Sequence, residues 1–350
     1  MIALQAVTPA QLVAAVPTVT LAEARKLVAA VHRGEGVQAS SAIRRSAADA
    51  VRAVGHVPTL AVVEETASAL DPFVKYLFES AGARFEAVRI PLADPARFTV
   101  CVSSQVGCAL ACAFCATGRL GLSRNLEAWE IVEQVRSVRA GLPAGGRAVG
   151  GPRITGVVFQ GMGEPMANLD HVLAAIAVMS EPSAMGIDAR AMTVCTAGLP
   201  SGIRRLAKEE PRVRLGLSLS SALVAHRKRV MPIAERYELD EVIAAVADHA
   251  RTTGLSPMWA VTLLAGVNDS DADARALAER TQAFAVATGI KPRISIVAYN
   301  AIGGDDPFLR STRETAFRRV LADAGLASHR RYSGGSDVGA ACGQLAARTA

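Results

Sequence analysis

The stretch CVSSQVGCALACAFCATG, residues 101–118, contains four of the six cysteines of this 350-residue chain. Three of them, Cys108, Cys112 and Cys115, form a C-x3-C-x2-C run, and Cys101 stands seven residues before it. Thiols this close in sequence can pair as disulfides, bind a metal or take part in a reaction. Because each of these roles belongs to a different kind of domain, the choice between them also decides the fold.

The overall composition argues against a disulfide scaffold. Six cysteines in 350 residues are too few for one, and a chain of this length can bury a large core without cross-links. Residues 1–20 have neither a basic segment nor an unbroken apolar run, so we infer no signal peptide. No apolar run reaches the roughly 18 residues that a membrane span needs. We therefore expect a cytoplasmic protein without membrane association, in which clustered thiols stay reduced and bind metal or react.

From residue 98 onward, short apolar runs alternate with segments whose apolar residues recur every three or four positions. The runs predict buried parallel strands, and the periodic segments predict helices that cover them. Six such units in series indicate an α/β fold, a complete or partial barrel. The predicted strands are 98–104, 154–160, 191–196, 213–220, 258–265 and 293–300, and the predicted helices are 126–140, 169–181, 238–254 and 271–289.

The N-terminal part follows a different pattern, in which two helices precede two strands (21–32, 41–55, 74–80 and 84–91). We take residues 1–85 as a small accessory domain with a basic helical face that suits RNA; a simple cap on the barrel is an equal alternative. Residues 86–350 then form the catalytic domain and its C-terminal segment. The Gly-rich stretch 141–153 predicts a mobile loop, and it lacks the spacing of a phosphate-binding motif.

Among metal centres, an iron–sulfur cube fits the cysteine run better than zinc does. Structural zinc sites have four ligands, often as two C-x-x-C pairs, and this chain has no second pair. Its six histidines are scattered, and none stands at ligand spacing from the run. Three thiolates on one short loop instead suit a cube whose fourth iron stays open to a small molecule.

The run and its position after the first barrel strand resemble the signature of the radical S-adenosylmethionine superfamily. That resemblance implies a partial (β/α)6 barrel and a [4Fe-4S] cluster whose open iron binds S-adenosylmethionine. It also extends over residues 74–346, where the motifs follow the order found in the RlmN/Cfr family of RNA methyltransferases. These motifs are KYLFES, FEAVRIP, CVSSQVGCALACAFCATG, FQGMGEPMAN, RVMPI, GVNDS and GAACGQLA.

The resemblance implies methylation of an adenine ring carbon, C2 in RlmN-type and C8 in Cfr-type enzymes, in large-subunit rRNA and in some cases tRNA. Such a carbon is electrophilic and cannot attack an ordinary sulfonium methyl group, so a radical route is needed. By resemblance, Cys342 receives a methyl group from a first S-adenosylmethionine, and a second one supplies the radical. Cys101 corresponds to the thiol that releases the product by forming a disulfide with Cys342, which an external reductant resets. Glu86 corresponds to the proton acceptor.

The residues implied in S-adenosylmethionine binding lie at the ends of later strands. Gly163 and Glu164 in GMGEP would allow close backbone approach and accept from the methionine ammonium. The remaining implied residues are Cys195, Ser218, Leu219, Ser220 and Asn300. Two of them depart from the family pattern, which has serine at the position of Cys195 and histidine at that of Ser220. We expect cofactor binding to survive the first change, whereas the second loses a ring that could contact the ligand.

The charge of the chain is compatible with RNA as the partner. The formal net charge is +6, and 33 of the 38 basic residues are arginine, whose planar fork suits phosphate. The best candidate patches are HRKR (226–229) and HRRYSGG (329–335), although such runs are also common on solvated surfaces. We further expect an external electron donor of the flavodoxin type and a monomeric protein.

Several functions remain open at this point. We favour C2 methylation, because GEP in the cofactor loop resembles the RlmN side of the family. The alternatives are Cfr-type C8 methylation and a family paralogue with another substrate. A rival of a different class is a non-catalytic RNA-binding module held by iron–sulfur or zinc, which would have no use for Cys342 or Cys101.

Overall fold

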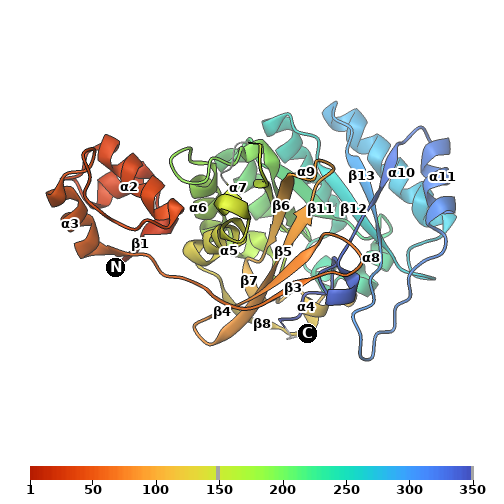
Figure 1. Cartoon of the computed structure of the whole chain (residues 1–350). Coiled ribbons are helices and arrows are strands. Elements are labelled where there is room, and N and C mark those ends of the chain that lie inside the picture. The colour runs from red at the N-terminus through yellow and green to blue at the C-terminus, as the bar shows by residue number, and fades with distance from the viewer. Residues whose placement is uncertain (147–149, 348–350) are drawn as a thin grey trace.

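The computed structural model describes residues 1–146 and 150–347, and one large sheet organises most of them (Figure 1). β6 and β9–β14 run parallel to one another, whereas β3, β4 and β5 form an antiparallel extension beside β6. The strand order has two ends, so the barrel is partial, as the sequence predicts. In spatial order the strands are β14 (Ser328–Arg331), β13 (Arg293–Ala298), β12 (Met258–Leu263), β11 (Arg214–Ser218), β10 (Met192–Thr196), β9 (Arg153–Phe159), β6 (Arg97–Val102), β5 (Ala83–Pro91), β4 (Val74–Ser80) and β3 (Ala61–Ala67).

Helices cover the outside of the parallel strands. The six predicted strands and four predicted helices are confirmed, with ends within two residues of the predicted ones. Apolar side chains fill the space between the layers; for example, Leu215 and Leu217 of β11 are fully buried. The covering helices are α5 (Ala128–Ala140), α6 (Leu169–Ser180), α7 (Pro200–Glu209), α9 (Leu239–Thr253), α10 (Asp271–Thr288) and α11 (Glu314–Asp323).

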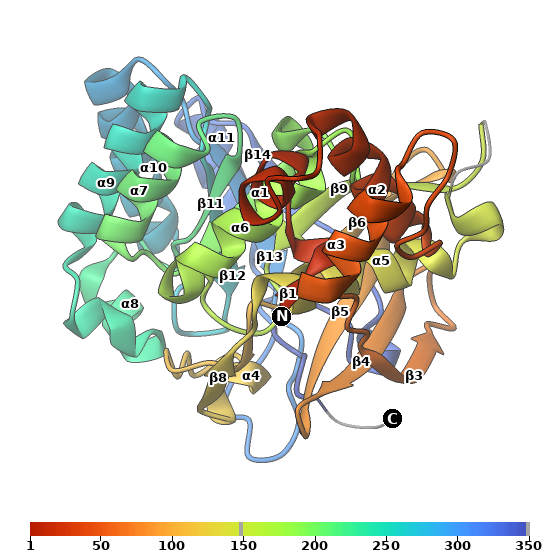
Figure 2. The ribbon, with the colours of Figure 1, turned by 90° about the vertical axis from the view of Figure 1, so that its left-hand side faces the viewer.

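The N-terminal helices α1 (Pro9–Ala15), α2 (Leu21–Arg33) and α3 (Arg45–Val54) enclose a hydrophobic core of their own. They lie in front of α5 and α6 in Figure 2. The contact with α5 is polar as well as apolar, because the Arg136 guanidinium donates to the carbonyl of Val31. These helices therefore form a distinct unit that is docked on the outside of the barrel.

The predicted domain boundary at residue 85 falls inside β5, and β3–β5 belong to the large sheet. We propose that the accessory unit ends instead near β2 (Gly55–His56), which pairs with β1 (Ile2–Ala3). The Gly-rich stretch at 141–153 includes residues 147–149, which lie outside the described residues.

The C-terminal segment (residues 332–347) crosses from β14 at one edge of the sheet to the strands at the other edge. Asp71, in the loop between β3 and β4, accepts from Tyr332 Oη at 2.8 Å and from the backbone N–H of Gly335 at 2.9 Å. In return, the Asp337 carboxylate accepts from Ser68 Oγ at 2.7 Å and from the N–H of Ala69 at 2.8 Å. This segment therefore connects the two ends of the open sheet.

None of the helices in the described part of the chain combines the length and apolarity that a membrane span requires.

Candidate active site

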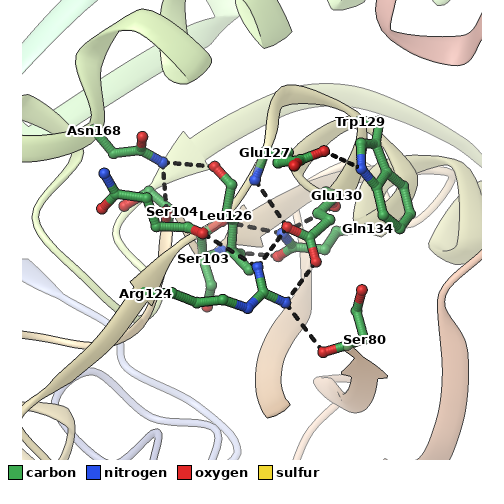
Figure 3. Close-up of polar contacts among 11 residues, drawn as sticks. Ser80, Ser103, Ser104, Arg124, Leu126, Glu127, Trp129, Glu130, Gln134 and Asn168 are labelled. Atoms are coloured by element: carbon green, nitrogen blue, oxygen red, sulfur yellow. Dashed lines mark hydrogen bonds and ion pairs between the residues drawn. The ribbon is translucent and has the colours of Figure 1, made fainter. Parts of the chain in front are cut away.

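The loop that carries the three clustered cysteines (residues 103–121, the cluster loop) begins directly after β6. Buried amides fix its start (Figure 3): Gln134 of α5 exchanges two hydrogen bonds with the backbone of Ser103, at 2.8 and 3.0 Å. Asn168 donates to the carbonyls of Ser104 and Leu126, at 2.7 and 2.8 Å. Because these bonds satisfy backbone groups in the interior, the loop leaves the sheet in one defined direction.

The far end of the cluster loop is held by an ion pair. β7 (Gln105–Gly107) pairs with β8 (Leu122–Asn125), and Arg124 of β8 makes two 2.8 Å bonds with the carboxylate of Glu130. Burial raises the pKa of Glu130, but Arg124 and the hydrogen bonds from the Glu127 backbone and Ser80 together outweigh burial and hold that pKa below its ordinary value. Gly107 has φ +74°, and a Cβ there would stand 1.9 Å from the carbonyl oxygen of Gly121. Only glycine therefore allows the two ends of the loop to meet.

The three cysteines of the run line one cavity. Burial raises the pKa of all three thiols, that of Cys108 to about 11, and the other two thiols raise the pKa of Cys112 further. Three thiolates here therefore need a cationic centre beside them. Among the described residues, no three His, Cys, Asp or Glu side chains are close enough to hold a single metal ion. An iron–sulfur cube attaches each thiolate to a different iron, so three thiols that line one cavity suit a cube held by three cysteines.

Two cavities, of about 120 and 150 Å³, adjoin at the tip of the cluster loop and share Cys115 and Cys342 in their linings. The larger, which we call the cofactor cavity, is lined by the cluster cysteines and by five of the predicted cofactor residues: Gly163, Glu164, Cys195, Ser218 and Ser220. The smaller, which we call the thiol cavity, is lined by Cys101, Cys342 and Arg331 among others. The fold thus collects residues from distant parts of the sequence around one thiol, that of Cys342.

The GMGEP turn shapes the floor of the cofactor cavity. Gly163 has φ +100°, and a Cβ at this position would lie 2.6 Å from Cβ of Gln105. Glu164 is buried, and its carboxylate accepts from the N–H groups of Met166 at 3.0 Å and Ala197 at 2.8 Å. Burial outweighs these bonds and raises the pKa of Glu164. A ligand ammonium in this cavity would lower the cost of keeping that carboxylate charged.

The two remaining predicted thiols meet in the thiol cavity. Cys101 lies on β6 opposite Val88 of β5, and burial raises its pKa to about 12, with a further contribution from the nearby Cys342 thiol. Cys342 is held through its backbone, because its N–H donates to Ser333 Oγ at 2.8 Å and its carbonyl accepts from Asn300 at 3.2 Å. Both thiols are free in this structure. They are therefore close to each other without being bonded.

Glu86 is buried and holds the C-terminal segment instead of facing a cavity. Its Oε1 lies 3.3 Å from Lys75 Nζ. Its Oε2 accepts from the N–H groups of Ala346 and Ala347, at 2.8 and 3.0 Å. Glu86 is absent from the linings of both cavities. In this conformation its carboxylate is engaged, so a role as proton acceptor requires the C-terminal segment to move.

Two predicted cofactor residues do not line the cofactor cavity. Leu219 is fully buried, and its N–H donates to the carbonyl of Ala260. Asn300 donates to Ser333 Oγ and to the carbonyl of Cys342, so it positions the C-terminal segment. Their predicted contacts with S-adenosylmethionine remain predictions.

The proposed basic patch at 226–229 is wrong as an exposed surface, because Arg227 points inward and is buried. Its guanidinium donates to the carbonyls of Ser218, Leu219 and Ala197, and so fixes strand ends that border the cofactor cavity. Lys228 pairs with two glutamates, at 3.1 and 3.3 Å. Only Arg229 of this group is exposed without an ion pair among the described residues.

Sequence reasoning also missed individual residues of the site. Gln160 lines both cavities, and Lys75 pairs with Glu86. Arg227 fixes strand ends beside the cofactor cavity, and Arg331 lines the thiol cavity. Arg331 belonged to a predicted surface patch at 329–335, whereas its side chain lines the thiol cavity. Strand alternation could have indicated this, since Arg330 and Arg331 must point to opposite faces of β14.

The chain is similar to known RNA methyltransferases in sequence and in fold. No family model matches the chain. A probable RNA methyltransferase of Sorangium cellulosum is 58% identical over 94% of this chain and 88% of its own length. A dual-specificity RNA methyltransferase RlmN of Syntrophobacter fumaroxidans is 42% identical over 78% of this chain and 76% of its own length. The crystal structure of a radical SAM methyltransferase from Sphaerobacter thermophilus superposes with a TM-score of 0.87 at 34% identity, over 99% of this chain and 100% of that one. The sequence identity to these relatives, together with the partial barrel shared with the Sphaerobacter thermophilus structure, places the chain in the RlmN/Cfr family of radical S-adenosylmethionine RNA methyltransferases.

Proposed function

We propose that this enzyme methylates C2 of an adenine in large-subunit rRNA, with tRNA as a second substrate, and that the methyl group passes through Cys342. The observation that carries the proposal is the position of Cys342 in the lining of both cavities. A side chain there can take a group from a donor in the cofactor cavity and present it to a base in the thiol cavity. The names of the RlmN relatives support RNA of more than one kind as substrate.

The cofactor cavity suits a [4Fe-4S] cluster held by Cys108, Cys112 and Cys115, with S-adenosylmethionine beside it. When bound, these groups supply the methyl group and the radical that an electrophilic ring carbon requires. The chain's own contribution is positional. Glu164 offers a buried carboxylate to the methionine ammonium, and Ser218 and Ser220 border the space beside it. An external reductant of the flavodoxin type would supply electrons.

In the thiol cavity, Cys101 is the group placed to complete the reaction. The base must leave its stack to enter a cavity of this size. After the one-carbon unit has joined Cys342 to the base, the Cys101 thiolate would attack the Cys342 sulfur, forming the disulfide and breaking the bond between that sulfur and the one-carbon unit. The electron pair of the broken bond would leave with the carbon, which takes up a proton to become the methyl group of the product. Burial raises the pKa of Cys101 to about 12, so its thiolate needs a base or a cation nearby when it attacks.

The first experiment tests the methyl carrier. Protein isolated from cells and digested should show an S-methyl group on Cys342 by mass spectrometry, and the Cys342→Ala variant should methylate no RNA. An unmodified Cys342 in protein that actively methylates RNA would contradict the proposal.

The second experiment tests the resolving thiol. The Cys101→Ala variant should accumulate a covalent RNA–protein adduct that denaturing gels retain. The matched control is Cys195→Ala, which removes another buried thiol, one that lines only the cofactor cavity. That control should give no adduct, whatever its effect on rate. Free methylated RNA released by Cys101→Ala would contradict the role of Cys101.

The third experiment identifies the product. RNA from a deletion strain, compared with the parent strain, should lack 2-methyladenosine at the sites this enzyme modifies. Loss of 8-methyladenosine instead would show Cfr-type chemistry. Stoichiometric zinc and no iron in protein reconstituted under anaerobic conditions would support a non-catalytic RNA-binding module.

A further inference from the structure

Arg331 is the last residue of β14, at the open edge of the sheet. Strand alternation separates it from its neighbour, because Arg330 points outward to Glu314 of α11, with Nε 3.4 Å from the carboxylate. The side chain of Arg331 instead lines the thiol cavity together with Cys101 and Cys342. A full positive charge therefore lies beside the two thiols that the proposed reaction uses.

One nitrogen of this guanidinium is not satisfied by the described part of the protein. Its Nη1 is sealed from solvent and has no hydrogen-bond partner among the described residues. Burial lowers the pKa of Arg331, but the thiols of Cys342, Cys195 and Cys101 outweigh it and raise the pKa overall. A covered N–H without an acceptor costs free energy, and the cost is larger for a charged group. The missing acceptor is therefore best supplied by a ligand in the cavity.

The walls of the thiol cavity indicate the kind of ligand. Val88, Ile90 and Phe73 supply apolar surface, and Tyr332 stands at the opening, 69% exposed. The Phe73 and Tyr332 rings meet edge to face with centroids 5.9 Å apart. Polar side chains also line the cavity, namely Arg331, Gln160, Thr117 and Ser333. Apolar and aromatic walls with polar groups among them are typical of sites that hold an unstacked base and read its edge. A phosphate would instead call for several cationic donors, and Arg331 is the one cationic side chain among the described residues of this lining.

The chemistry of adenine then specifies the acceptor. A base whose reacting carbon faces Cys342 also turns the ring nitrogens beside that carbon toward the same wall. For C2 these are N1 and N3, and for C8 the free neighbour is N7. Each has an in-plane lone pair that a guanidinium N–H can meet.

We propose that Arg331 donates a hydrogen bond to a ring nitrogen next to the adenine carbon that is methylated. This inference rests on the proposed function and makes Arg331 a substrate-contacting residue. The bond would orient the carbon toward Cys342. It would also draw electron density from the ring, which favours addition of a carbon radical.

The test uses the cluster-containing enzyme and a synthetic RNA hairpin with one unpaired adenosine, of the sequence found by mapping. The variants are Arg331→Gln and Arg331→Lys, each also made with Cys101→Ala. The hairpin is prepared with adenosine and with its 1-deaza, 3-deaza and 7-deaza analogues at the target. The measurements are S-methylation of Cys342 without RNA, the dissociation constant of the hairpin, and the rate of adduct formation.

We expect Cys342 methylation to be retained, because that step involves no RNA. Adduct formation with adenosine should fall about 10- to 100-fold in Arg331→Gln, as expected for loss of one charge-assisted hydrogen bond. One analogue, 1-deaza or 3-deaza for C2 chemistry, should slow the parent enzyme by a similar factor and slow Arg331→Gln little further. This non-additivity identifies the nitrogen that Arg331 contacts.

The matched control is Arg330→Gln, which removes the same charge from the other face of β14. Any effect of this control should be equal for adenosine and all three analogues. Loss of Cys342 methylation in Arg331→Gln would overturn the inference, because the residue would then serve the thiols. Equal slowing by every analogue in both enzymes would overturn it as well. If the parent enzyme itself gave no S-methyl group or adduct, the proposed function would fail, and the two failures are thus distinguishable.

Discussion

The hydrogen bonds between the Glu86 carboxylate and the C-terminal segment allow a direct test of what keeps that segment in place. Replacing Glu86 by glutamine keeps the shape of the side chain and removes its charge. The two bonds from Ala346 and Ala347 then change from charge-assisted to neutral, a loss of about 1 kcal/mol each. About 2 kcal/mol corresponds to a roughly 30-fold increase in local detachment of the segment.

The same substitution leaves Lys75 buried without its partner. Its side chain is only 8% exposed, and breaking a buried ion pair by removing one partner costs about 3–5 kcal/mol. The free energy of unfolding of Glu86→Gln should therefore fall by about 3 kcal/mol or more. Glu86→Gln combined with Lys75→Met should recover part of this loss, because no unpaired charge remains.

Hydrogen exchange separates the local effect from the global one. The amides of Ala346 and Ala347 should exchange about 30-fold faster in Glu86→Gln than in the parent protein. The control is Glu130→Gln, which removes another buried carboxylate, paired with Arg124 in the network of Figure 3. That variant should lose stability without accelerating exchange at residues 346 and 347. Equal exchange at these amides in the parent and Glu86→Gln would refute the reasoning.

Three further substitutions test other parts of the site. Gly163→Ala should lower the free energy of unfolding by about 2 kcal/mol or more and weaken S-adenosylmethionine binding, because the added Cβ would meet Gln105 at a residue with positive φ. The control Gly254→Ala also has positive φ but no atom within 4 Å of the added Cβ, so it should cost only about 1 kcal/mol and leave the affinity for S-adenosylmethionine unchanged. Equal losses of stability and affinity in the two variants would contradict this prediction. Arg227→Lys should lose one or two charge-assisted hydrogen bonds, about 2–3 kcal/mol by urea unfolding, and an unchanged urea midpoint would contradict it. Burial lowers the pKa of His249 to about 4, so the unfolded chain binds a proton that the folded chain does not, and stability should fall by about 1.4 kcal/mol per pH unit as pH drops from 6.5 toward 4. His249→Leu should weaken that slope in urea midpoints measured at pH 7 and pH 5, and an unchanged slope would contradict the assignment.

Sequence patterns predicted the parallel core because its strands are continuous apolar runs. They did not predict β3, since its residues are largely exposed and Val62 and Val63 face solvent at the edge of the sheet. The antiparallel extension therefore looked like part of a separate domain. A single buried face leaves too weak a signal to show which sheet a strand joins.

For the site, the motif located the cysteines and the GMGEP turn but not the contacts that cross the chain. The bond between Glu86 and Ala346 joins residues 260 positions apart, and no local pattern encodes it. For Arg227 a local pattern was present, but the surface location that it predicted was wrong. A basic run predicts a solvated surface, whereas this guanidinium is buried by the three carbonyls it binds. Charge alone does not reveal whether an arginine faces water or the backbone of its own fold.

The segment that bears Cys342 is also the one that ties β14 to the β3–β4 loop through Asp71 and Asp337. Release of this segment would move Cys342, the proposed methyl carrier, away from the cavities and would also remove the contacts that join the two edges of the barrel. Entry of the RNA and renewed methylation of Cys342 would then both depend on the same movement of the C-terminal segment. The turnover rate would depend on how often the C-terminal segment detaches from the β3–β4 loop. A cross-link between that segment and the loop would stop the catalytic cycle while leaving every reactive group in place.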